Sequence, residues 1–200
     1  MPARYPEADL GYNAAKHDEG NLMEDTLSMY RRASQWTAQK VAGASGDLDA
    51  STPDDEWDVR TLLNHMLDTQ RYFAGAARGE NASMPSPEPP PLLSDDPIAD
   101  FTQAQQEVLD AFGRPGVIER TGPSLSFAIS DQLLHGWDLA RATDQDTTMP
   151  EGLAEAAYAT IHGRLTDENR KGMFKPEIAV PNDASPQDKL LAYTGRSPST

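Results

Sequence analysis

The sequence contains no cysteine, which excludes disulfides, thiolate metal ligands and a cysteine nucleophile. Any bound metal ion would therefore have to be held by histidine, aspartate or glutamate. Histidine is itself scarce, with four residues in a chain of 200. The positions at which a histidine and a carboxylate share one helix face are therefore the first candidates for a metal site.

The chain also lacks a long hydrophobic run. No stretch of roughly 18 apolar residues, the length that a membrane-spanning helix needs, occurs anywhere, and the opening residues have no apolar core of a secretion signal. We therefore expect no membrane partner and a cytoplasmic protein. With 38% hydrophobic residues, the chain is long enough for one domain with a sizeable core.

The chain has few basic residues relative to acidic ones. There are 17 Lys and Arg against 32 Asp and Glu, which gives a formal net charge of −15. Such a chain repels phosphate backbones and anionic lipid, so we expect no nucleic-acid partner. The acidic residues are spread along the whole sequence, a pattern typical of a soluble surface and without catalytic meaning.

Apolar residues recur with the period of helices, and no segment alternates long enough to indicate a sheet. Helices are predicted near residues 21–43, 58–79, 98–112, 124–142 and 150–165, and a short one is predicted after Ser185, with Pro186 at its first position. Residues 117–122 are predicted to be a short strand or an extended linker. The predicted fold is all-α: a four-helix bundle with an extra C-terminal helix and an extended tail.

Two segments fall outside this helical pattern. Residues 1–20 contain two prolines and two glycines without a sustained period and are predicted to form an N-terminal arm, which leaves 21–198 as a single helical domain. Residues 81–97 are rich in proline and are predicted to run extended over the surface between two helices.

One predicted helix carries a stripe of polar residues on an otherwise buried surface. Asp131 and His135 are four residues apart and therefore lie on one helix face. His65 occupies a similar apolar setting on an earlier helix. Two histidines and one carboxylate projecting into a bundle would leave coordination positions open on Zn²⁺, Ni²⁺, Fe²⁺ or Mn²⁺.

Three further residues are candidates to assist this site. Asp68 and Asp138 each follow one of the two histidines by three residues, so each is a candidate to orient an imidazole. Arg141 is a candidate to assist catalysis, or to form an ordinary surface ion pair with Asp138. The alternative interpretation of the whole stripe is a hydrogen-bonded core histidine without metal. His162 has a weaker claim because no acidic residue lies four positions away, and His17 has a weaker claim because it lies in the predicted N-terminal arm.

Three stretches of the sequence resemble a known family. They are EWDVRTLLNHMLDTQRYFAGAARGE (Glu56 to Glu80), LLHGWDLARATDQ (Leu133 to Gln145) and VPNDASPQDKLLAYTGRSP (Val180 to Pro198). They are similar to actinobacterial metal-binding proteins related to DinB and to the N-terminal domain of mycothiol-dependent maleylpyruvate isomerases. The resemblance spans roughly Asn21 to Pro198.

The resemblance implies a DinB-like four-helix bundle that binds a divalent metal through a histidine of the second helix and an acidic residue and a histidine of a later helix. Those roles would fall on His65, Asp131 and His135. Asp131 departs from the isomerases, which have glutamate there. The chain also lacks their separate C-terminal domain, so the exact isomerase activity is not implied.

The family also implies a chemistry. Similar proteins use low-molecular-weight thiols such as mycothiol, so we expect a metal-dependent transferase or isomerase, with zinc as the first metal and nickel, iron or manganese as alternatives. Its nucleophile would be a bound water or thiolate, and its substrate a small electrophile. The alternatives are a hydrolase or lyase using metal-bound hydroxide, and a non-catalytic bundle that binds a metal or ligand. The resemblance also suggests a homodimer.

Overall fold

The computed structural model describes residues 10–54, 56–166, 170 and 174–198, with side chains from residue 26 onward. These residues form seven helices and no strand, apart from an isolated bridge between Ser51 and Asp58. The helices are α1 (Leu10–Ala44), α2 (Val59–Arg78), α3 (Pro97–Phe112), α4 (Val117–Thr121), α5 (Ser124–Ala142), α6 (Leu153–Ile161) and α7 (Pro186–Tyr193). The predicted all-α class is confirmed.

Local signals in the sequence set several helix ends. The Asp58 carboxylate accepts a hydrogen bond from the backbone N–H of Thr61 and so caps the start of α2. Gly79, with φ of 79°, ends that helix in the left-handed conformation that glycine adopts without strain. The Ser185 hydroxyl caps α7 in the same way as Asp58, with Pro186 in the first turn.

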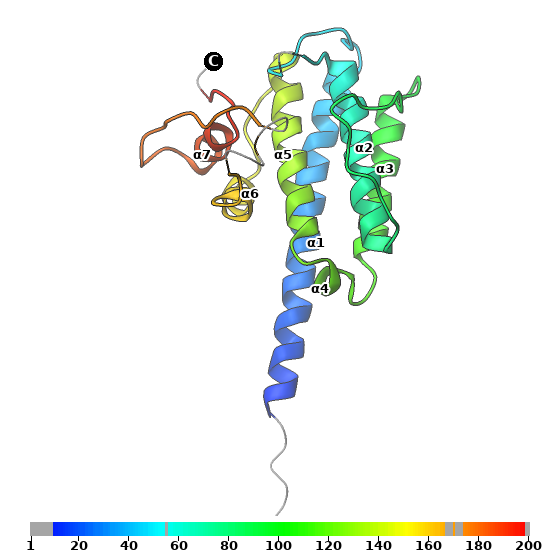
Figure 1. Ribbon diagram of the computed structural model, residues 1–200, viewed down its shortest axis with the longest axis vertical. Coiled ribbons are helices and arrows are strands. Elements are labelled where there is room, and N and C mark those ends of the chain that lie inside the picture. Colours follow the sequence, from blue (N-terminus) through cyan, green and yellow to red (C-terminus); the bar gives the residue numbers. More distant parts are fainter. Residues whose placement is uncertain (1–9, 55, 167–169, 171–173, 199–200) are drawn as a thin grey trace, which may run out of the picture.

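Four helices make the bundle, and the smaller ones pack at its edges. Helix α1 lies along α5 and α2 lies along α3, while α6 and α7 form a separate group beside α5 (Figure 1). The short α4 closes the end of the bundle near the start of α5. The C-terminal segment thus returns to α5, the helix that carries two of the candidate metal ligands.

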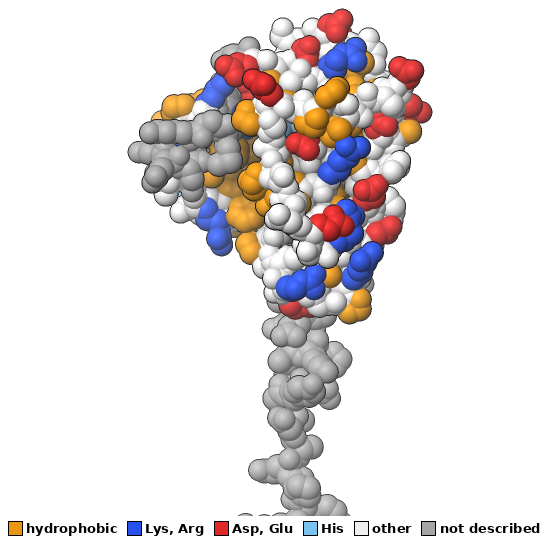
Figure 2. Space-filling model, turned by 45° about the vertical axis from the view of Figure 1, so that its right-hand side comes forward, with side chains coloured by type: hydrophobic (Ala, Val, Ile, Leu, Met, Phe, Trp, Pro, Cys, Tyr) orange, Lys and Arg blue, Asp and Glu red, His pale blue; other side chains and the backbone are white. Residues whose placement is uncertain are grey.

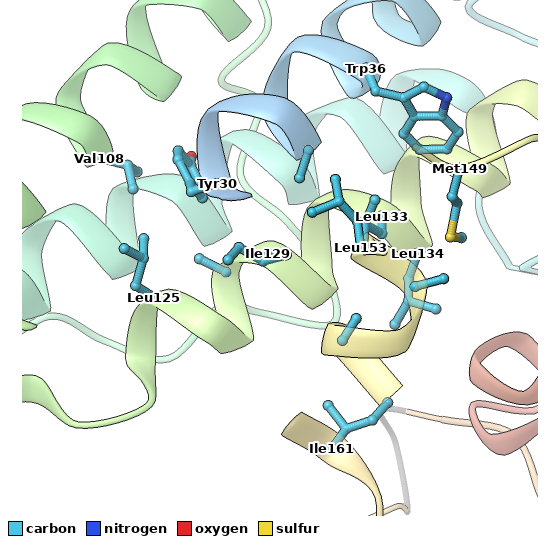
Figure 3. Packing of buried hydrophobic residues seen from close by; sticks show 14 of the residues in the cluster. Tyr30, Trp36, Val108, Leu125, Ile129, Leu133, Leu134, Met149, Leu153 and Ile161 are labelled. Carbon is cyan, nitrogen blue, oxygen red and sulfur yellow. The ribbon is translucent and has the colours of Figure 1, made fainter. Parts of the chain in front are cut away.

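The core is continuous along α1, α5 and α6. Tyr30 of α1, Leu125 and Leu133 of α5 and Leu153 of α6 are almost completely buried, and their side chains lie together in one cluster (Figure 3). A second cluster, built on Leu62 and its neighbours, joins the end of α1 to α2 and α3. Burial of these side chains fixes the mutual positions of α2 and α5, on which the candidate site depends.

Helices α1 and α5 approach each other closely at a glycine. A methyl group at Gly136 would lie 2.5 Å from Cζ3 of Trp36 and 2.9 Å from Oγ1 of Thr37. Any side chain here would require the Trp36 ring or one of the two helices to move. Because Gly136 directly follows His135, a shift of α5 at this point would also move the candidate metal ligand.

Two predictions about local structure are wrong. Residues 10–20 are not an irregular arm but continue α1, whose N-terminal part extends beyond the other helices (Figure 1); residues 1–9 of the predicted arm lie outside the described residues. Residues 117–121 form the helix α4 rather than a strand or extended linker, with Gly116 supplying a positive φ at its start. Five residues are too few to show a helical period in the sequence.

Acidic and basic side chains are interspersed on the surface. On the face shown in Figure 2, acidic and basic side chains lie close to one another rather than in a single patch. This arrangement is consistent with dispersed acidity that serves solubility. None of the helices in the described part of the chain has the length and apolar character needed to cross a membrane.

Candidate metal site

The structure brings three of the predicted residues together. One potential ligand atom from each of His65, Asp131 and His135 lies within 4.8 Å of the other two. His65 comes from the second turn of α2, and the other two come from neighbouring turns of α5. The predicted cluster of two histidines and one carboxylate is therefore present as a geometric unit.

The cluster is partly open to solvent. The side chains of His135 and Asp131 are 14% and 16% exposed, so an ion or a small molecule can reach them. The rings of His65 and His135 meet edge to face with their centroids 4.9 Å apart. The His65 ring also contacts the ring of Trp57, with the centroids 4.7 Å apart and the planes inclined by 43°.

Two buried polar atoms of this cluster have no hydrogen-bond partner among the described residues. They are Nδ1 of His65 and Oδ2 of Asp131. An unpartnered buried polar atom costs roughly 1–3 kcal/mol, and most such atoms in proteins are satisfied. One cation could satisfy such atoms on two of the three candidate ligands, so these residues fit a divalent metal.

The orientation of His135 is set from the other side of its ring. Its Nδ1 lies 3.1 Å from Oδ2 of Asp138, a carboxylate that can only accept, so Nδ1–H donates. Its Nε2 then faces Oδ1 of Asp131 at 3.5 Å. In the neutral ring both of these atoms are acceptors, and two acceptors facing each other need a positive charge between them, either a proton or a metal cation.

The charge states of the site follow from burial and from the charges of neighbouring groups. Burial, with help from the charges of His135 and Arg196, lowers the pKa of His65 to about 3, so this ring is neutral and able to act as a ligand. Burial raises the pKa of Asp131. Burial by itself would raise the pKa of Asp138 too, but the charge of Arg196 and hydrogen bonds from His135 and Arg196 lower it to about 2.

Asp138 was predicted either to orient an imidazole or to pair with Arg141 at the surface. The structure shows the first arrangement: Asp138 is only 2% exposed and is hydrogen-bonded to His135. Its ion pair is made with Arg196, whose Nη2 lies 2.7 Å from Oδ2, and not with Arg141. Arg141 instead lies over the ring of Trp137, with its guanidinium carbon 5.9 Å from the ring centroid.

Asp68 does not take the orienting role predicted for it. Its carboxylate accepts a hydrogen bond from the backbone N–H of Ser86 at 3.3 Å, and it is not part of the three-residue cluster. Nearby, Oδ1 of Asn64 accepts from the backbone N–H groups of Leu92 and Leu93. Asp68 therefore belongs to a set of side chains on α2 that hold the proline-rich segment in place.

Two residues at the site were missed from the sequence. Arg196, which binds Asp138, lies 58 positions away along the chain, and helical spacing cannot relate the two. Trp57 lies just before α2, and no helical spacing relates it to the candidate ligands. The only signal for either was its presence in stretches that carry the family resemblance, TGRSP for Arg196 and EWDVR for Trp57.

Two cavities flank the segment before α2. One, of about 440 Å³, is bordered by Asp138 and Arg196 from the site and by apolar side chains including Trp137 and Phe174. The other, of about 450 Å³, is bordered by Trp57 and Thr61. Each therefore reaches a residue that contacts one of the two candidate histidine ligands, and their volumes suit a small molecule.

Fold and site together define a helical bundle with a cluster of two histidines and one carboxylate between two of its helices. A comparison with protein families matches residues 30–140 to the mycothiol maleylpyruvate isomerase N-terminal domain. The chain belongs to this family, whose domain is a DinB-like helical bundle associated with metal binding. The matched residues include all three members of the cluster.

Similar proteins occur in an actinobacterium. Two uncharacterized proteins of Mycobacterium tuberculosis, from strains CDC 1551 / Oshkosh and ATCC 25618 / H37Rv, are each 28% identical to this chain over 187 residues. The alignments cover 86% of this chain and 98% of each relative, so the similarity extends beyond the family domain to the C-terminal part. No solved structure matches the chain significantly.

Proposed function

We propose that this protein is a divalent-metal-dependent enzyme that acts on a small electrophilic substrate together with a low-molecular-weight thiol of the mycothiol type, as a transferase or isomerase. His65, Asp131 and His135 would hold the ion. The observation that carries the proposal is the convergence of these three side chains with an unpartnered buried atom on two of them.

The donor set indicates which metal to test first. Two imidazoles and one carboxylate, without any thiolate, suit Zn²⁺ and equally accommodate Ni²⁺, Fe²⁺ or Mn²⁺. Zinc is proposed first because a three-ligand site with an open position is its usual catalytic arrangement. When bound, such an ion would act as a Lewis acid and lower the pKa of a thiol or water molecule beside it.

The chain's own residues prepare the site for this chemistry. The hydrogen bond from His135 to Asp138 leaves Nε2 facing Asp131. Trp57 covers the His65 ring and limits the access of water from that side. The cavity beside Asp138 and Arg196 offers room for a small molecule next to the cluster. The thiol itself is proposed from family membership, since the family is that of a mycothiol-dependent isomerase domain.

Two other functions are compatible with the same cluster. A hydrolase or lyase would use the ion with water rather than a thiol. A non-catalytic protein would use it for stability, but a structural zinc site is closed by four protein ligands, whereas the cluster in the described part of the chain has three. The partial exposure of Asp131 and His135 also favours an open, reactive site over a closed one.

Metal content is the first test. Protein prepared without a histidine tag should contain close to one metal ion per chain by elemental mass spectrometry, and His65→Ala and His135→Ala should lose it. His162→Ala is a matched control, because His162 packs against Tyr158 and Tyr193 away from the cluster. A parent protein that is folded but stays empty after addition of zinc, nickel, iron or manganese would refute the proposal.

Thiol dependence separates the two enzymatic functions. Metal-loaded protein should accelerate the reaction of mycothiol with small electrophiles, or a thiol-dependent isomerisation, and His135→Ala should not. Reaction of activated esters or amides without any thiol would instead support the hydrolase. Binding of the metal without either activity would favour the non-catalytic protein.

A further inference from the structure

Arg196 connects the C-terminal segment to the candidate metal site. Its Nε lies 2.8 Å from Oδ1 of Asp138, and its Nη2 lies 2.7 Å from Oδ2. Two parallel hydrogen bonds from a guanidinium to a carboxylate are the strongest and most directional ion pair that side chains form. The orientation of the Asp138 carboxylate is therefore fixed by Arg196.

Asp138 passes this orientation on to His135. Oδ2 of Asp138, which accepts from Arg196, also accepts from Nδ1–H of His135 at 3.1 Å. Because an imidazole is rigid, fixing Nδ1 fixes the direction of Nε2 on the opposite side of the ring. The hydrogen bonds that lead from Arg196 through Asp138 to His135 therefore fix Nε2 of His135, which faces Asp131.

Helix α7 and the turn that follows it place Arg196 against α5. Leu190 and Leu191 of α7 are fully buried and anchor the helix in the core. After α7, Gly195 adopts a positive φ of 78°, and the backbone N–H of Arg196 donates to the carbonyl of Leu191. This turn after the helix points Arg196 back toward α5.

The ion pair also compensates the buried negative charge of Asp138. Asp138 is almost fully buried, and a buried carboxylate without a cationic partner is strongly unfavourable. Asp131 lies two turns earlier on the same face of α5, so an uncompensated Asp138 would add a second negative charge to the site. Loss of Arg196 should therefore disturb the charge of Asp138 as well as its geometry.

We propose that Arg196 is a positioning residue for the metal site: through Asp138 it fixes the orientation and tautomer of His135, and so sets the metal affinity. This inference rests on the proposed function, since it takes His135 to be a ligand. It also gives the C-terminal segment a role, because a residue beyond the matched family domain would then complete the site.

Metal affinity tests the proposal directly. The dissociation constant for Zn²⁺ should be measured by competition with a chromophoric chelator for the parent, Arg196→Gln, Arg196→Lys and Asp138→Asn. Removing a group that orients a metal-binding histidine typically weakens binding about 10- to 100-fold. We expect Arg196→Gln to fall in that range, and Arg196→Lys, which keeps the charge but not the paired hydrogen bonds, to be intermediate.

Two comparisons separate positioning from general damage to the fold. In the double variant Asp138→Asn with Arg196→Gln, the loss should be no larger than in Asp138→Asn alone, because Arg196 acts through Asp138. Arg120→Gln is the matched control: Arg120 also donates to the protein, to the carbonyl of Ala77, but does not touch the site. Unchanged zinc affinity in folded Arg196→Gln, or an equal loss in Arg120→Gln, would overturn the proposal.

A second measurement does not need the metal. Nitrogen chemical shifts of the His135 ring in metal-free protein at mildly alkaline pH should show the tautomer with the proton on Nδ1, and Arg196→Gln should convert it to a mixture. If the parent binds no metal, the proposed function fails while this measurement still decides whether Arg196 orients His135. If the metal binds but the tautomer and affinity are unchanged in Arg196→Gln, only the present inference fails.

Discussion

The rings of His65 and His135 meet edge to face, with centroids 4.9 Å apart and planes inclined by 79°. His65 belongs to α2 and His135 to α5, so this contact joins two helices that are separated in the chain by α3 and α4. The His65 ring, which its low pKa keeps neutral, and the His135 ring lie beside Asp131, so three potential ligands for a cation meet between the two helices.

The first prediction concerns Asp131→Asn. In metal-free protein the carboxylate is unfavourable, because burial raises its pKa and Oδ2 has no partner. The neutral amide should therefore raise the unfolding temperature, by roughly 2–4 °C for each kcal/mol gained. With saturating zinc the parent should become the more stable of the two proteins, because zinc binding stabilises the parent and the Asn variant lacks the carboxylate ligand. Thermal unfolding with and without zinc measures both effects, and an Asn variant that is less stable in the metal-free state would indicate a structural carboxylate instead.

The second prediction uses Trp57 as a reporter. Its ring lies 4.7 Å from that of His65, whereas Trp36 and Trp137 are buried in the bundle core. Binding of Ni²⁺ or Co²⁺ should therefore quench tryptophan emission mainly through Trp57. Trp57→Phe should abolish most of this quenching while still binding the metal, and Trp36→Phe should retain it. Equal quenching in the parent and in Trp57→Phe would place the ion elsewhere.

The third prediction concerns the close approach of α1 and α5. Gly136→Ala would place a methyl group 2.5 Å from the Trp36 ring, so the buried ring or one of the helices must move. Such overpacking costs about 1–3 kcal/mol of unfolding free energy. Gly46→Ala is the control, because a methyl group there meets nothing within 4 Å. Urea unfolding of both variants should show a loss for Gly136→Ala only; an equal stability of the two would mean that the helices adjust freely at this point.

Short-range signals made much of the fold predictable. The helix ends at Asp58, Gly79 and Ser185 depend on capping within a few residues, and all three lie where the sequence placed them. The convergence of His65 with Asp131 and His135 was also anticipated, because a bundle turns apolar faces inward and the histidines lie on such faces. The pairing of helices, in contrast, was not read from periodicity.

What escaped prediction depends on contacts between distant parts of the chain. The spacing of three residues made Arg141 a plausible partner for Asp138, but the partner is Arg196, which the C-terminal segment brings back to α5. The same spacing suggested that Asp68 orients His65, whereas its carboxylate faces the proline-rich segment. Helical spacing relates residues on one helix, and it does not reveal which other segment covers them.

The fourth prediction concerns the turn that delivers Arg196. At Gly195 the backbone has φ of 78°, and a methyl group would lie 2.7 Å from the carbonyl carbon and oxygen of Lys175. Gly195→Ala therefore cannot be accommodated by a side-chain movement, and we expect the turn to shift and zinc affinity to fall as far as in Arg196→Gln.

Gly79→Ala is the control for backbone strain alone, since Gly79 has φ of 79° with nothing within 4 Å. It should lose roughly 1–2 kcal/mol of unfolding free energy and keep its zinc affinity. Isothermal titration with zinc on both variants distinguishes the two effects. If Gly195→Ala is destabilised but binds zinc as tightly as the parent, the turn contributes to the fold only, and the C-terminal segment does not position His135 through it.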